Sequence, residues 1–212
     1  MEPFVRETGA AAPLAMPNID TDVIMPKTFL KGIDRHGLAV GVFHLLRFTD
    51  GQPNPAFILN QPGYQRARFL IVGPNFGCGS SREHAVWGLV QLGIRALIGT
   101  SFAGIFEDNC QNNGLATLSL APGEIARLLD LAGDPPRNQL TIDLPSQSIA
   151  VDATGDHFEF AIEPARKERL MTGLDAVAAT LRHADEIRAF EDRHRVAHPW
   201  LRESVPGAAE SP

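Results

Sequence analysis

The sequence has few cysteines, and this scarcity excludes several classes of protein. Cys78 and Cys110 are the two cysteines among 212 residues, too few for the disulfide framework of a small secreted protein. Two thiols are also fewer than an iron–sulfur cluster or a structural zinc site usually takes from cysteine. We therefore expect no metal site within this chain.

Basic residues and long apolar runs are scarce as well. The chain has 19 Lys and Arg against 25 Asp and Glu, which gives a net charge of -6. Nucleic-acid binding usually requires an excess of positive charge, so the composition argues against such a partner. No apolar run approaches the length of a membrane-spanning helix, and no signal-peptide pattern opens the sequence. We expect a cytoplasmic protein with neither nucleic acid nor membrane as partner.

Apolar runs and helical patterns alternate through the middle of the chain. Apolar, β-branched runs predict buried strands at 69–72, 95–100 and 115–120. Helical spacing between them predicts helices at 85–92 and 102–110. Strand, helix and strand at this spacing form a parallel unit, so the fold class is α/β.

The remaining segments are assigned from local patterns. Residues 4–9 are a possible edge strand, and 140–151 read as a hairpin around a Pro-Ser turn. Residues 164–196 are predicted to be largely helical. We expect one domain over residues 1–200 and a disordered tail over 203–212.

Reactive side chains are concentrated in the ten residues that follow the first buried strand. They read Asn75-Phe76-Gly77-Cys78-Gly79-Ser80-Ser81-Arg82-Glu83-His84. Gly77 and Gly79 allow a sharp turn and a close approach to a ligand. A loop between a strand end and a helix start is where α/β sheets bind ligands, and the helix amides favour an anion. Arg82 adds a planar fork suited to a carboxylate or phosphate.

A structural role competes for part of this loop. Ser80 and Glu83 fit a capping box, in which each side chain satisfies the other's backbone amide. Such boxes begin many helices that bind nothing. The alternative is that Ser81 caps the helix and leaves Ser80 free, and the sequence does not separate the two.

Alternating polar residues lie between two prolines near the N-terminus. In a strand, Asn18, Asp20 and Asp22 would point to one side; a surface turn of self-bonding Asx residues is an equal alternative. The spacing lacks the glycine and distal glutamate of a calcium loop. Residues 27–42 are predicted as a short helix and a loop. The basic residues of this loop either close over an acidic substrate or form a solvated face.

Several stretches together resemble the small subunits of bacterial 3-isopropylmalate dehydratases, in the aconitase superfamily. The Gly-Ser-Ser-Arg-Glu-His run is specific to the superfamily, and the flanking matches narrow the likeness, which covers residues 3 to 195. It implies a swivelling β/β/α domain with C-terminal helices. The matching stretches are Asn18-Ile19-Asp20-Thr21-Asp22, Pro26-Lys27-x-Phe29-Leu30, Gln52-Pro53-Asn54-Pro55, Asn75 to Ala85, Ser101-Phe102-Ala103, Asn112-Asn113, Thr172-Gly173-Leu174-Asp175 and Thr180-Leu181.

The resemblance implies a hydro-lyase of leucine biosynthesis. The reaction would interconvert 2-isopropylmalate and 3-isopropylmalate through 2-isopropylmaleate. It implies a large-subunit partner, in a heterodimer or heterotetramer, whose 4Fe-4S cluster acts as a Lewis acid on the leaving hydroxyl. This chain would hold no cofactor and would be inactive alone.

The family pattern also implies roles for individual residues. Ser80 would be the catalytic base, which requires strong stabilisation of its anion because a serine hydroxyl is a poor base. Ser81 and Arg82 would bind a substrate carboxylate, and Asp22 would take part in substrate binding beside them. The segment that selects the substrate side chain would comprise Phe29, Leu30, Lys31 and Arg35.

Three other functions are compatible with the sequence. His44-Leu45-Leu46 stands where relatives tend to carry an aromatic pair, so a smaller malate or citraconate is an alternative substrate. A non-catalytic anion-binding protein is the second. A cysteine hydrolase using Cys78 is the third; His84 is nearby, but it falls inside the predicted helix and no third orienting group is apparent.

Overall fold

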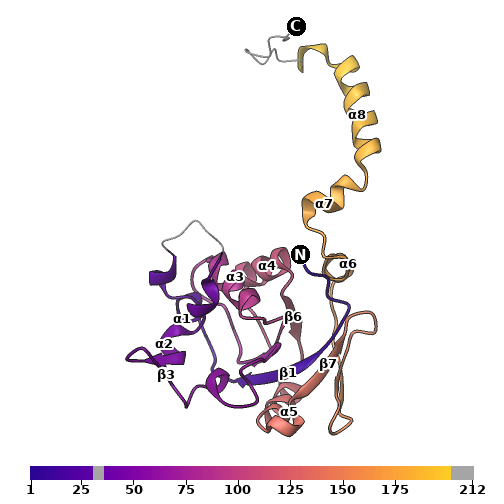
Figure 1. Cartoon of the computed structure of the whole chain (residues 1–212). Coiled ribbons are helices and arrows are strands. Elements are labelled where there is room, and N and C mark those ends of the chain that lie inside the picture. The colour runs from indigo at the N-terminus through magenta and orange to yellow at the C-terminus, as the bar shows by residue number, and fades with distance from the viewer. Residues whose placement is uncertain (31–35, 202–212) are drawn as a thin grey trace. The chain divides into compact units, whose positions relative to one another are not determined.

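A seven-stranded sheet organises the first of two compact units, Met1–Gly173 and a second that begins at Leu174. The computed structural model describes residues 1–30 and 36–201. Within them the sheet runs in the order β6-β5-β4-β1-β7-β8-β9 and is curled (Figure 1). The α/β class and the swivel-type fold expected from the sequence are confirmed by the family and structural comparisons given below.

Half of the sheet is parallel. It comprises β1 (Arg6–Leu14), β4 (Phe69–Val72), β5 (Ala96–Gly99) and β6 (Ala116–Ser119). Neighbours pair in parallel, with Leu70 opposite Leu97 and Leu97 opposite Thr117. Every residue of β4 and β5 is buried, as expected for strands covered on both faces. The three strands predicted from apolar runs are therefore confirmed.

The other half of the sheet is antiparallel. It comprises β7 (Gln139–Asp143), β8 (Ser148–Val151) and β9 (His157–Glu159), and β7 and β8 form the predicted hairpin. The strand β1 belongs to both halves, because Arg6 to Ala10 pair with β7 and Ala11 to Leu14 pair with β4.

The strand predicted at residues 4–9 is present from Arg6 onward, but it is not an edge strand. The strand continues to Leu14 and has a partner on either side. Gly9 and the three alanines that follow it have low β-strand propensity, and so the predicted strand ended at Gly9. Ala11 and Ala12 are nevertheless fully buried, one in each of the two core clusters.

Within the described residues, helices cover both faces of the sheet. The helices α3 (Glu83–Gln91) and α4 (Gly104–Asn113) pack over Ala12, Leu70 and Leu97. The helix α5 (Pro122–Ala132) packs over the alternate residues, among them Ile71. The helix α6 (Pro164–Thr172) adds Leu170 to the same core cluster and pairs with α4 through Arg166 and Glu107. The helices predicted at 85–92 and 102–110 are confirmed, with ends displaced by a few residues.

Short elements fill the connections. Where the sequence predicted a short helix and a loop over 27–42, the described residues form two 3-10 turns. The short elements are α1 (Thr21–Ile24), η1 (Lys27–Phe29), η2 (Leu38–Val40), α2 (His44–Arg47), β2 (Phe48–Thr49), β3 (Gln52–Pro53), η3 (Ile58–Asn60) and η4 (Pro135–Arg137).

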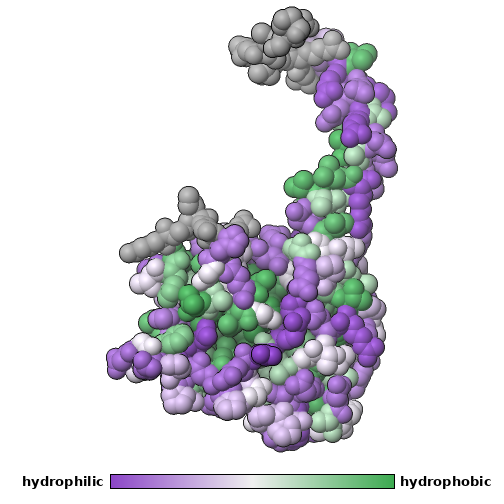
Figure 2. Space-filling model, viewed as in Figure 1, coloured by the Kyte–Doolittle hydropathy of each residue, from purple (hydrophilic) through white to green (hydrophobic). Residues whose placement is uncertain are grey.

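The second unit is helical, as predicted. It contains α7 (Ala176–Leu181), α8 (Ala184–Ala197) and η5 (Pro199–Leu201). Hydrophilic residues predominate along α8 in Figure 2, and none of the described helices is both long and apolar enough to cross a membrane. The tail predicted at 203–212 lies outside the described residues.

Candidate functional site

Three loops meet beyond the carboxyl ends of β1, β4 and β5. Backbone hydrogen bonds join them into a short ladder that continues past the sheet. The bonds run from Asn18 N to Pro74 O (2.9 Å), Gly77 N to Ile19 O (2.7 Å), Thr21 N to Cys78 O (2.9 Å), Phe76 N to Ser101 O (3.3 Å) and Ala103 N to Phe76 O (3.0 Å). Residues 75–84 form the reactive loop. These hydrogen bonds hold it on two sides to other parts of the chain, at the edge where open α/β sheets bind ligands.

Left-handed backbone conformations shape the loop. Asn18 and Asn75 have φ of 55° and 56°, a region that asparagine tolerates better than most residues. The Asn75 amide donates to Asn18 Oδ1 over 2.9 Å, so the two turns support each other. Gly77 and Gly79 have φ of +79° and +91°, which confirms the predicted glycine turn; a Cβ at Gly77 would overlap the ring of Phe106.

The segment before α1 is not a strand. Asp20 caps the helix, because its Oδ1 accepts a hydrogen bond from Val23 N over 2.7 Å. The Asx alternative therefore holds for Asp20, and the one-sided strand prediction is wrong. The helix turns Asp22 onto the reactive loop, where its carboxylate forms an ion pair with Arg82.

The ion pair fixes the guanidinium of Arg82. The Arg82 side chain is 18% exposed and that of Asp22 46% exposed, so the pair lies at the surface of the loop. A guanidinium has five N–H donors, and one carboxylate does not use them all. The arrangement can therefore accept a second carboxylate from a ligand.

The predicted capping box is not formed. The helix α3 begins at Glu83 with Arg82 at the N-cap, and no side chain among the described residues caps it. Glu83 accepts instead from Asn113 Nδ2 of α4 (2.7 Å), and Ser80 is engaged by Thr21. Partners from distant segments displaced the local pairing for both residues. The first-turn amides of α3 thus lack a side-chain cap and remain suited to an anion.

Two serines and one buried threonine lie together. Ser80 and Ser81 are exposed, while Thr21 is 1% exposed. The Oγ1 atom of Thr21 is 3.0 Å from the carbonyl oxygen of Ser80 and 3.2 Å from its Oγ. The sequence pattern alone predicts no role for Thr21. The available signal was its place between two aspartates in a stretch that matched the family.

The predicted specificity segment is described in part. Phe29 and Leu30 pack against the core cluster beneath α3. The His44 ring lies between two aromatic rings, with centroids 4.8 Å from Phe29 and 4.9 Å from Phe48. Lys31 and Arg35 lie outside the described residues. The specificity role of this segment stays a prediction.

The geometry does not assemble a cysteine–histidine pair. Cys78 Sγ lies 3.4 Å from the carbonyl oxygen of Asn18, while the His84 ring packs 4.6 Å from that of Trp87. Cys110 is fully buried in α4, and burial raises the pKa of its thiol. Over residues 1–30 and 36–201, no group of three or more His, Cys, Asp or Glu side chains is arranged for a metal ion.

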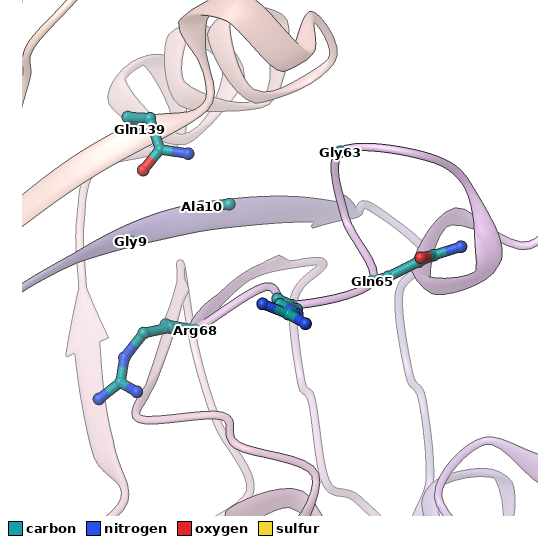
Figure 3. A pocket seen from close by; sticks show the side chains of 7 residues that line it. Gly9, Ala10, Gly63, Gln65, Arg68 and Gln139 are labelled. Carbon is teal, nitrogen blue, oxygen red and sulfur yellow. The ribbon is translucent and has the colours of Figure 1, made fainter.

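A hollow of about 440 Å³ lies at the amino ends of β4 and β7, away from the reactive loop. Its polar side chains do not converge, and in Figure 3 Arg68 and Gln65 point in different directions. Each has another partner: Arg68 pairs with Glu7, and the Gln65 amide donates to Asn60 O. We therefore place the candidate site at the carboxyl ends of the strands.

Two family models match the chain. Residues 1–123 match the aconitase C-terminal domain, and residues 177–204 match the C-terminal domain of the 3-isopropylmalate dehydratase small subunit. The first match covers more than half of the chain and includes all three loops of the site.

Curated relatives match over nearly their whole length. The small subunit 1 of 3-isopropylmalate dehydratase from Mannheimia succiniciproducens is 54% identical over 203 residues, covering 95% of this chain and 100% of the relative. The corresponding protein from Caulobacter vibrioides, also a 3-isopropylmalate dehydratase small subunit, is 46% identical, covering 95% and 99%. A crystal structure of a 3-isopropylmalate dehydratase from Methanocaldococcus jannaschii has a TM-score of 0.65 at 26% identity, covering 88% of this chain and 99% of the other.

Proposed function

The chain belongs to the family of 3-isopropylmalate dehydratase small subunits, within the aconitase superfamily, and on this premise we propose that it is the small subunit of that hydro-lyase. The enzyme interconverts 2-isopropylmalate and 3-isopropylmalate by dehydration and rehydration, a step of leucine biosynthesis. The relatives' designation as small subunits implies a large-subunit partner. We place the complex in the cytoplasm, as a heterodimer or heterotetramer.

One observation carries the proposal: α1 and the loop before α3 bring a serine, an arginine and its carboxylate partner together. We infer that Ser80 exchanges the proton next to a substrate carboxylate. Arg82 and Ser81 bind that carboxylate. Because Asp22 is paired with Arg82 and would repel a dicarboxylate, the geometry favours it as the group that orients the guanidinium.

The role of Ser80 requires stabilisation of its anion. The uncapped first turn of α3 supplies a positive dipole end next to the loop, and Arg82 adds a full positive charge. Both are fixed before the substrate binds, so they can act on the developing charge without rearrangement.

The residues of this chain do not fit an iron–sulfur cluster. Such clusters take three or four thiolates, and here Cys110 is buried within the core while Cys78 lies in the loop. We therefore assign the 4Fe-4S cluster to the large subunit. The part of this chain is to bind the carboxylate and to hold and move a proton at Ser80 Oγ.

A smaller substrate is the second candidate. The ring of His44 fills the space between Phe29 and Phe48, next to the segment assigned to specificity. With His44 packed there, this side of the substrate site would leave less room for a branched side chain of the substrate. A series of 2-alkylmalates and citraconate, assayed with the complete enzyme, separates the two: kcat/KM highest for 2-isopropylmalate supports the first candidate.

The decisive experiment combines the chain with its large subunit. Hydration of the unsaturated intermediate is followed by loss of ultraviolet absorbance, and iron is measured in each purified protein. We expect turnover in the mixture alone and iron in the large subunit alone. Equal activity of the large subunit without this chain would show that the chain is non-catalytic, and a stoichiometric cluster in this chain would contradict the assignment of the iron.

A further inference from the structure

We propose that Thr21 is a positioning residue for Ser80, and that its hydroxyl donates to Ser80 Oγ when that oxygen carries negative charge. The inference rests on the proposed function, because it assumes that Ser80 acts as the base. It is carried by two distances, 3.0 Å from Thr21 Oγ1 to Ser80 O and 3.2 Å to Ser80 Oγ, and by the burial of Thr21.

The position of the Thr21 hydroxyl is set by its backbone. Thr21 N donates to Cys78 O in the reactive loop, and Thr21 O accepts from Met25 N at the end of α1. The cap formed by Asp20 fixes the start of the same helix. A β-branched side chain has restricted χ1, so little freedom remains beyond rotation of the hydroxyl proton.

The Thr21 hydroxyl can change its hydrogen-bond acceptor when Ser80 loses its proton. A threonine hydroxyl has one proton and two lone pairs. With Ser80 neutral, Thr21 donates to Ser80 O and accepts the Ser80 hydroxyl proton. With Ser80 deprotonated, Thr21 turns its proton from the carbonyl oxygen to Ser80 Oγ. The switch needs no movement of heavy atoms.

The proton transfer is then balanced. Ser80 Oγ takes the proton from the substrate carbon, and the electron pair of that C–H bond enters the new double bond as hydroxide leaves the neighbouring carbon. Thr21 returns its proton to Ser80 O and again accepts from Ser80. In the rehydration the steps run in reverse: hydroxide adds to one carbon, Ser80 Oγ gives its proton to the other, and Thr21 again donates to the Ser80 anion. A buried donor acts in a low local dielectric, which strengthens a hydrogen bond to an anion.

Two matched variants, in the enzyme assembled with its large subunit, test the proposal. Thr21→Val keeps the shape of the side chain and removes the hydroxyl; Thr21→Ser keeps the hydroxyl. For Thr21→Val we expect kcat to fall roughly 10- to 100-fold with KM within about twofold, the size of one lost hydrogen bond to a charged group. For Thr21→Ser we expect kcat within about threefold of the wild type.

The pH profile separates this role from a purely structural one. Without the donor, the pKa of the Ser80 hydroxyl rises, so the acid limb of kcat should move up by about one to two pH units in Thr21→Val. Both variants retain the charged and titratable groups around Ser80, which are Asp20, Asp22, Cys78, Arg82, Glu83 and His84. A structural defect would instead lower the melting temperature and leave the profile in place.

An unchanged kcat and pH profile in Thr21→Val would overturn the proposal, as would a Thr21→Ser variant as slow as Thr21→Val. If Thr21→Val does not fold, Thr21→Ala replaces it as the variant without a hydroxyl. An inactive wild-type complex would refute the proposed function itself, and so the two failures are distinguishable.

Discussion

The two ends of the parallel strands place charge in different environments. At the amino ends, Arg68 and Arg95 directly precede β4 and β5, and both pair with Glu7. The Arg95 side chain is 6% exposed and also donates to two backbone carbonyls. At the carboxyl ends, Arg82 pairs with Asp22 at the surface of a loop, beside two exposed serines.

The difference shows which charges are available to a ligand. A buried guanidinium must be satisfied within the protein, because its desolvation is costly. Arg95 meets this requirement and has little capacity left. Arg82 keeps donors and access to solvent, so the same residue type serves structure at one end and recognition at the other.

The largest effect is expected at the carboxyl end. Ser80→Ala should lower kcat roughly 100- to 10,000-fold, the range for loss of a general base, while leaving subunit association and stability unchanged. Steady-state rates and size-exclusion chromatography of the mixture measure the two properties. Ser146→Ala, in the turn between β7 and β8, is the matched control; a near-normal rate in Ser80→Ala would end the base assignment.

The opposite behaviour is expected at the amino end. Arg95→Met should destabilise the fold by about 2–4 kcal/mol, because Glu7 keeps Arg68 but loses its buried partner, and two backbone carbonyls lose a donor. The kcat of the folded, assembled protein should be unchanged. Urea unfolding measures the stability.

The control for Arg95→Met is Arg188→Met on α8, where Arg188 and its partner Asp185 are 73% and 98% exposed. Loss of such a surface pair should change stability by less than about 1 kcal/mol. Equal effects in the two variants would remove the distinction between the environments.

Arg82→Lys tests whether carboxylate binding needs the planar guanidinium of Arg82 or only its positive charge. Lysine keeps the positive charge but cannot bind a carboxylate through two parallel N–H groups. We expect kcat/KM to fall roughly 10- to 100-fold with little change in stability. An unchanged kcat/KM would mean that Arg82 contributes charge without geometry.

The smallest contrast is between the two thiols. Burial raises the pKa of the Cys110 thiol, so at pH 8 less of it is present as the reactive thiolate than for an exposed cysteine. Burial also keeps the reagent from reaching Cys110 in the folded protein. Iodoacetamide should therefore label Cys78 first, as peptide mass spectrometry of the native chain would show. Equal labelling would indicate that the core around α4 opens readily.

Much of this fold could be predicted because its central elements are strongly patterned. The runs Phe69–Val72 and Ala96–Gly99 are apolar throughout, and helical spacing marks α3 between them. β1 was predicted incompletely because its small residues acquire their strand character from the neighbouring strands rather than from local propensity.

The residues of the site could be singled out from sequence, but their partners could not. Thr21 and Ser80 are 59 positions apart, and a similar separation divides Asp22 from Arg82. No local pattern reports such contacts. The capping-box prediction failed for the same reason, since Asn113 of α4 engages Glu83 from another element.

The double pairing of β1 has a consequence for how the protein is made. Because Arg6 of β1 pairs with Asp143 of β7, β1 leaves the ribosome long before β7 has been synthesised. Pairing between residues so far apart in the sequence slows folding, and β1 cannot complete its pairing until the hairpin of β7 and β8 has been synthesised. Nascent chains stalled shortly before that hairpin should remain sensitive to protease along β1, whereas chains stalled well beyond it should resist; equal resistance in the two would show that the N-terminal strand is secured without it.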